Sequence, residues 1–195
     1  MDIVYNFDDL DLTKSYTYSD YLKWHFKERV ELIRGFIAKM SPAPNLSHQR
    51  VSANLSGCLY INFRKNSREF FAAPFDVRLP IASAKKDTTV IQPDFCVVCD
   101  ASKLDSKGCN GAPDLTIEII SQNNSKHDSV TKFKLYQEAG VKEYWIIDPI
   151  EKLLNVYFLQ NDIYIGLPPQ SEGEKIKSNL FPELNIALDD VFENL

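Results

Sequence analysis

Glu118 is an acidic residue inside the most apolar stretch of the chain, DLTIEII at 114–120. Successive side chains of a strand point to opposite faces, so Leu115 and Ile117 share one face and Glu118 lies on the other. A carboxylate in such a strand carries a desolvation cost unless a cation, a metal or several hydrogen bonds compensate it. Two explanations stay open: Glu118 belongs to a functional site, or it lies near the strand's end and reaches solvent.

Two further acids occupy similar positions. Asp94 follows Pro93 and precedes the apolar run FCVV, and Glu31 lies within VELIR. Aspartate after proline commonly caps a turn, so Asp94 alone is a weak indication. Three acids on separate strands that meet in a sheet could form a divalent-metal site, because hard cations bind carboxylate oxygens. Asp76, in FDVRL, is a spare candidate.

A cation and an imidazole could complete such a site. At about 100° per residue, Lys132 falls within the apolar arc of the helix expected after Glu118, whereas Lys134 points away. An ordinary Asp128–Lys132 pair at i, i+4 explains the position of Lys132 equally well. His48 begins a helix after a proline-rich turn, where it could touch substrate or metal or serve as a surface or capping residue.

The elements that would position these residues follow from hydrophobic periodicity and turn residues. The patterns predict a mixed α/β sheet with flanking helices, and 100–112 as a surface loop. We expect helices at 17–28 with Ser19 as cap, at 47–64 with Ser47 as cap, and at 125–139 ending at Gly140. Strands are expected at 30–34 and 36–40, joined by a hairpin turn at Gly35, and at 70–79, 89–99, 114–120, 143–147, 153–158 and 163–165. Pro93 predicts an edge or a bend in its strand, and 114–120 is expected to be central.

Size and composition predict one globular domain over residues 1–195. The chain has 195 residues, of which 44% are hydrophobic and 25% charged, which are ordinary values for such a domain. The first twelve residues lack the features of a signal peptide, and no apolar run reaches the ~18 residues of a membrane span. We therefore expect a soluble, cytoplasmic protein without a membrane partner. Cys96 and Cys99 form a CxxC, but without further ligands they are more typical of structural thiols than of zinc.

The net charge of −5 argues mildly against a nucleic-acid partner, since phosphate binding needs cations. Charge is unevenly distributed, however. No acid lies between Glu31 and Glu69, where six basic residues do: Arg34, Lys39, Arg50, Arg64, Lys65 and Arg68. This segment could form a basic face or simply a solvated helix with random charge.

Several segments together resemble a known family. The pieces ELIRGFIAKMSPAPNLSH, IQPDFCVV, LTIEIISQ and GVKEYWIIDP occur in the family's order. The chain is similar, over about 17–160, to bacterial proteins classed as restriction endonucleases, once a domain of unknown function, within the PD-(D/E)XK nuclease superfamily. Ile120 stands where the superfamily's usual lysine would fall, and Gln122 and Lys142 stand where prolines are common in relatives.

The resemblance implies a restriction-endonuclease-like fold and metal-dependent phosphodiester hydrolysis. Asp94 matches the aspartate of PD, Glu118 the following acid and Glu31 an acid on the first element; these would bind Mg²⁺ or Mn²⁺. Lys132 matches a lysine of the following helix that replaces the usual one, and His48 matches a histidine expected to bind substrate. The implied partner is DNA, with a possible homodimer for double-strand cleavage.

Two alternatives to an endonuclease stay open. The acidic net charge and the displaced lysine suit a non-catalytic nucleic-acid-binding or regulatory module. The aromatic tail, which includes Trp145, Tyr157, Phe158 and Tyr164, suits a protein-interaction module.

Overall fold

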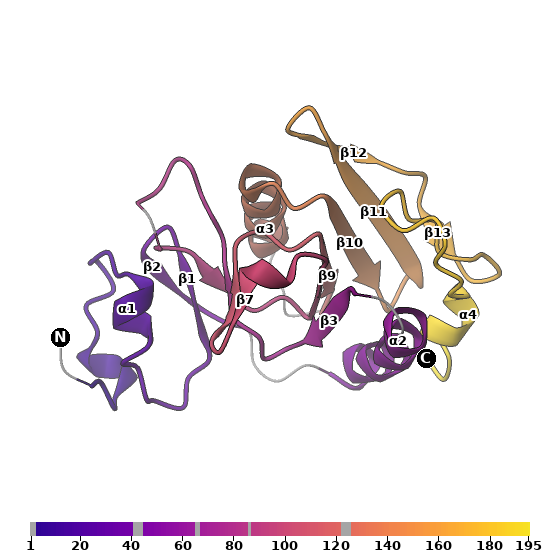
Figure 1. Ribbon diagram of the computed structural model, residues 1–195. Coiled ribbons are helices and arrows are strands. Elements are labelled where there is room, and N and C mark those ends of the chain that lie inside the picture. The colour runs from indigo at the N-terminus through magenta and orange to yellow at the C-terminus, as the bar shows by residue number, and fades with distance from the viewer. Residues whose placement is uncertain (1–2, 41–44, 65–66, 86, 122–125) are drawn as a thin grey trace.

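The computed structural model describes residues 3–40, 45–64, 67–85, 87–121 and 126–195. It contains two mixed β-sheets with helices packed against them (Figure 1). The helices are η1 (Phe7–Asp9), α1 (Tyr18–Tyr21), α2 (Leu46–Phe63), η2 (Ala101–Lys103), α3 (Lys126–Ala139) and α4 (Leu188–Val191). None of the described helices is both long and apolar enough to cross a membrane.

The smaller sheet has six strands in the order β2-β1-β5-β4-β8-β7. They are β1 (Val30–Ile33), β2 (Phe36–Lys39), β4 (Val77–Arg78), β5 (Val90–Ile91), β7 (Leu104–Asp105) and β8 (Gly108–Asn110). The predicted hairpin at Gly35 is present: Arg34 and Gly35 both have positive φ, 53° and 91°, as a two-residue hairpin turn requires. Glycine is needed there because a Cβ on Gly35 would lie 2.1 Å from Oγ of Ser15.

The larger sheet has seven strands, ordered β12-β11-β10-β9-β6-β3, with β13 paired to β11. They are β3 (Glu69–Ala72), β6 (Phe95–Val98), β9 (Leu115–Ile119), β10 (Glu143–Asp148), β11 (Leu153–Gln160), β12 (Ile163–Gly166) and β13 (Gln170–Ser171). The β9 strand is central, as its continuous apolar run predicted, and pairs in parallel with β10.

Helices cover both faces of this sheet. Val51, Leu55 and Leu59 of α2 pack on one face with Ile117 and Trp145, in a cluster completed by the C-terminal segment. On the other face, the second half of α3 packs against β6 and β10 and against strands of the smaller sheet. The alternation along β9 turns Ile117 toward α2 and Glu118 toward α3.

Two predicted strands are each divided between the sheets. The expected strand 70–79 is β3 in the larger sheet and β4 in the smaller one, with Pro74 between them. The expected strand 89–99 is likewise β5 and β6, with the chain crossing between the sheets at Pro93. A proline cannot donate to a strand ladder, so pairing stops there and the chain can change sheets.

Other boundaries also differ from the predictions. The helix expected at 17–28 ends at Tyr21, because the backbone of Lys23 and His25 pairs with Val4 instead of continuing the helix. Its N-cap is Thr17 rather than Ser19.

Two further corrections concern α2 and the expected surface loop. Asn45, not Ser47, caps α2 and accepts the backbone N–H of His48 at 2.9 Å. The 100–112 segment is not simply a loop: it contains η2, β7 and β8, because buried Cys109 pairs with Val77 of β4. Ser125, the expected start of α3, lies outside the described residues, while Gly140 ends the helix with a φ of 83°.

Candidate functional site

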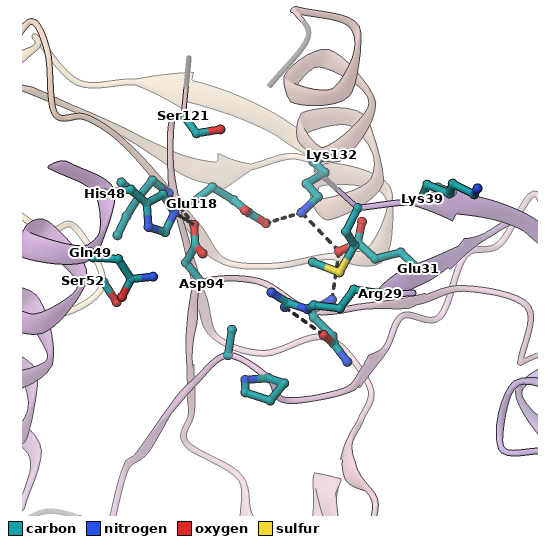
Figure 2. A pocket seen from close by; sticks show the side chains of 16 residues that line it. Arg29, Glu31, Lys39, His48, Gln49, Ser52, Asp94, Glu118, Ser121 and Lys132 are labelled. Carbon is teal, nitrogen blue, oxygen red and sulfur yellow. Dashed lines mark hydrogen bonds and ion pairs between the residues drawn. The ribbon is translucent and has the colours of Figure 1, made fainter. Parts of the chain in front are cut away.

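One pocket is lined by all five residues that the sequence indicated: Glu31, His48, Asp94, Glu118 and Lys132 (Figure 2). They come from five segments: β1, the start of α2, the crossing before β6, β9 and α3. The pocket therefore lies where the two sheets and both long helices converge.

Strand pairing positions the carboxylates. The antiparallel register of β6 and β9 pairs Phe95 with Ile117, so extending it by one residue brings Asp94 beside Glu118. Oδ2 of Asp94 accepts the backbone N–H of Ile119 at 2.8 Å. The PD proline is thus at the bend where the chain enters the larger sheet, and the aspartate after it is held by backbone.

Glu31 enters from the smaller sheet. Its Oε1 accepts the backbone N–H of Gln92 at 3.0 Å, just before the crossing that carries Asp94. Glu31 is buried, with 4% of its surface exposed, so the hydrogen bond and a cation must replace its hydration.

Lys132 supplies that cation. Its Nζ lies 3.1 Å from Oε1 of Glu118 and 3.2 Å from Oε1 of Glu31, and only 10% of its side chain is exposed. Figure 2 shows Lys132 between the two carboxylates. Lys132 therefore faces the sheet, as its position in the helical arc predicted. The alternative partner was Asp128, whose side chain lies outside the described residues.

Tyr136 is part of this arrangement and sequence reasoning did not assign it a role. It lies one turn after Lys132, and its hydroxyl donates to Oε1 of Glu118 at 2.6 Å. Burial and the Glu118 carboxylate raise the pKa of Tyr136 well above its usual value, so it stays a donor. The available signal was a tyrosine four residues after Lys132, within the apolar arc of the same helix.

Burial raises the pKa of Glu118 to about 7. Lys132 and the Tyr136 hydroxyl lower this pKa, whereas the negative charges of Asp94 and Glu31 raise it. Burial therefore outweighs the effect of Lys132, and Glu118 changes charge near neutral pH.

His48 contacts Asp94 from the first turn of α2. Its Nε2 lies 3.3 Å from Oδ2 of Asp94, and its side chain is 8% exposed. Nδ1 is buried and has no hydrogen-bond partner among the described residues. A proton on Nε2 fits this contact, because that nitrogen then donates to the carboxylate.

The described residues include no group of three or more His, Cys, Asp or Glu side chains arranged to hold a metal ion. Lys132 and Tyr136 engage Glu118, and His48 and Ile119 engage Asp94. The donor chemistry still fits a hard cation: the carboxylates of Glu31, Asp94 and Glu118 line one pocket, and such oxygens are the ligands of Mg²⁺ and Mn²⁺.

The remaining candidates have other surroundings. Asp76 accepts from the Tyr21 hydroxyl at 3.2 Å and from the Gln92 amide at 2.9 Å. Cys96, of the CxxC, is a free and fully buried thiol whose pKa is raised by that burial. Trp145 is fully buried in the core, so this residue of the aromatic tail presents no surface to a protein partner.

Paired acids at adjoining strands of a mixed sheet, with a lysine from the following helix, define this chain as restriction-endonuclease-like. Residues 18–189 match the model of the Uma2 family, described as "Putative restriction endonuclease", and the chain belongs to that family. The fold is similar to the crystal structure of "a putative nuclease belonging to DUF820" from Anabaena variabilis, with 20% sequence identity, 90% of this chain and 97% of that chain covered, and a TM-score of 0.68. A comparison with curated proteins gave no match.

Proposed function

We propose that this protein is a divalent-metal-dependent endonuclease that hydrolyses phosphodiester bonds of DNA in the pocket of Asp94, Glu118 and Lys132. The single observation that carries the proposal is the ammonium group of Lys132 beside Glu118, in the pocket that also contains Asp94. Family membership supports the nuclease assignment.

Asp94 and Glu118, with Glu31, would hold Mg²⁺ or Mn²⁺. When bound, such a cation orients water and stabilises negative charge that develops on the phosphate. Lys132 places a fixed positive charge where the phosphate oxygens gain charge, which lowers the barrier without reorganisation of solvent. Tyr136 and His48 orient Glu118 and Asp94, respectively, and His48 also lies in the pocket wall within reach of substrate.

The test is cleavage of supercoiled and linear DNA with Mg²⁺, with Mn²⁺ and with chelator. We expect Glu118→Gln and Lys132→Met each to lower metal-dependent cleavage by about 10²–10³-fold. Lys134→Met is the matched control, since Lys134 is exposed on the same helix and its loss should leave cleavage unchanged. Full cleavage in both site variants would refute the assigned roles.

A non-catalytic nucleic-acid-binding module is the second candidate. The net charge of −5 and the engagement of Lys132 by two carboxylates favour it. It predicts salt-dependent DNA binding with no cleavage under any divalent metal, so the same assay separates the two. The homodimer and the cytoplasmic location stay predictions; light scattering on the purified protein tests the first.

A further inference from the structure

A second hollow adjoins the catalytic pocket, and we call it the aromatic groove. Its walls include Tyr21, Trp24, Phe26, Lys27, Arg29 and Gln92. Arg29, Gln92 and Pro74 line both hollows, so the groove continues from the catalytic pocket without an intervening element. A ligand that fills one can extend into the other.

Three aromatic rings form one side of the groove. The ring centroid of Trp24 lies 5.5 Å from that of Tyr21 and 5.9 Å from that of Phe26, with the Trp24 and Phe26 planes 28° apart. All three side chains are only partly buried, although they pack on the N-terminal core cluster. A rigid core therefore holds aromatic surface open toward the groove, the kind of surface on which nucleobases stack.

The charges beside these rings suit a phosphate. Lys27 and Arg29 are exposed in the groove and Glu28 is the one acid among its lining residues. Nη2 of Arg29 lies 3.2 Å from Oε1 of Gln92, whose backbone N–H donates to Glu31 of the catalytic cluster. Gln92 thus links Arg29 to the Glu31 carboxylate, and Arg29 lies where the two hollows adjoin.

We propose that the aromatic groove binds an unpaired nucleobase of the DNA strand, next to the phosphate in the catalytic pocket, with Arg29 binding the linking phosphate. This inference rests on the proposed endonuclease function and adds the substrate class. A base inside a duplex has both faces covered by its neighbours, so a base must be unstacked before it can lie on Trp24 or Phe26. Single-stranded, frayed or mismatched DNA is therefore the preferred ligand.

The first experiment changes only the ligand. Binding of a fluorescent single-stranded oligonucleotide is measured in chelator by anisotropy and compared with an abasic strand of equal length and charge. Stacking of one base adds about 5- to 150-fold to affinity, so the abasic strand should bind more weakly by that factor. Trp fluorescence gives a second readout: Trp145 is fully buried, so quenching by the normal strand reports on Trp24.

The second experiment changes the groove. Trp24→Leu and Phe26→Leu should each reduce the preference for the normal over the abasic strand, while Arg29→Gln should weaken binding of both strands equally. Tyr60→Leu and Arg64→Gln are matched controls at the far end of α2 from His48. They should change neither the preference for the normal strand nor the affinity for either strand. Phe26→Leu keeps the test valid if Trp24→Leu fails to fold by circular dichroism.

The possible results separate the two proposals. Equal affinity for normal and abasic strands, in a protein that binds and cleaves DNA, would overturn the base site and leave the endonuclease in place. A protein that neither binds nor cleaves any DNA would overturn both.

Discussion

Lys132 joins the two sheets through Glu31: its Nζ, on a helix packed against the larger sheet, lies 3.2 Å from a carboxylate of the smaller one. The same ammonium contacts Glu118 at 3.1 Å. One cation therefore bridges two carboxylates from different sheets. Changes to any neighbour should shift the pKa of Glu118 in a direction that the contacts determine.

Glu31→Gln should lower the pKa of Glu118. The negative charge of Glu31 is one of the causes that raise this pKa, and the substitution also leaves Lys132 with one carboxylate fewer to neutralise. The glutamine carbonyl can still accept the backbone N–H of Gln92. The measurement is the pH at half-maximal cleavage, which should move downward; an upward shift would contradict this account.

Tyr136→Phe should have the opposite effect. The Tyr136 hydroxyl lowers the pKa of Glu118 by donating at 2.6 Å, so its loss raises that pKa and moves the acidic limb of the pH–rate profile upward. Tyr164→Phe is the control, because it removes a buried hydroxyl that bonds to the Val141 carbonyl, away from the pocket. Both variants should lose about 1 kcal/mol of stability, but only Tyr136→Phe should shift the profile.

The metal-free protein should lose stability as pH rises toward neutrality. The pKa of Glu118 is about 7 in the folded protein against 4.5 as its ordinary value, so the folded state holds this proton more tightly than the unfolded state. The free energy of unfolding therefore falls between about pH 4.5 and pH 7, by about 3 kcal/mol from this group.

Glu118→Gln has no carboxyl to ionise at this position. The variant should lack this fall in the free energy of unfolding and be more stable than the wild type at pH 8. Urea unfolding in chelator at several pH values measures the free energy of unfolding of both proteins. Glu151→Gln, in an exposed turn, is the control and should follow the wild type. An unchanged pH dependence in Glu118→Gln would show that another group is responsible.

The cap of α2 gives a prediction independent of catalysis. Asn45→Ala removes the side-chain acceptor for the backbone N–H of His48 and should cost about 1 kcal/mol of unfolding free energy. Ser47→Ala, at the position that the sequence favoured as cap, should cost much less. Thermal denaturation compares the two variants directly. A larger loss of stability in Ser47→Ala than in Asn45→Ala would contradict the assignment of Asn45 as the cap.

Local sequence patterns determined the parts of this protein that depend on neighbouring residues alone. Alternation identified β9 and turned Glu118 away from Ile117, and helical periodicity turned Lys132 toward the sheet. The hairpin at Gly35 and the end of α3 at Gly140 followed from turn chemistry. Each of these features depends on backbone preferences and side-chain period within one segment.

Only the tertiary structure decided which segments meet. The crossings at Pro74 and Pro93 divide two apparently continuous strands between two sheets. The missing N–H of a proline permits such a change of sheet, but it does not by itself show that one occurs. Several contacts of the site join residues distant in the chain. Tyr136 bonds to Glu118, and Lys132 contacts Glu31. Trp24 lines one groove together with Pro74 and Gln92. Such contacts depend on packing between elements, which no local pattern records.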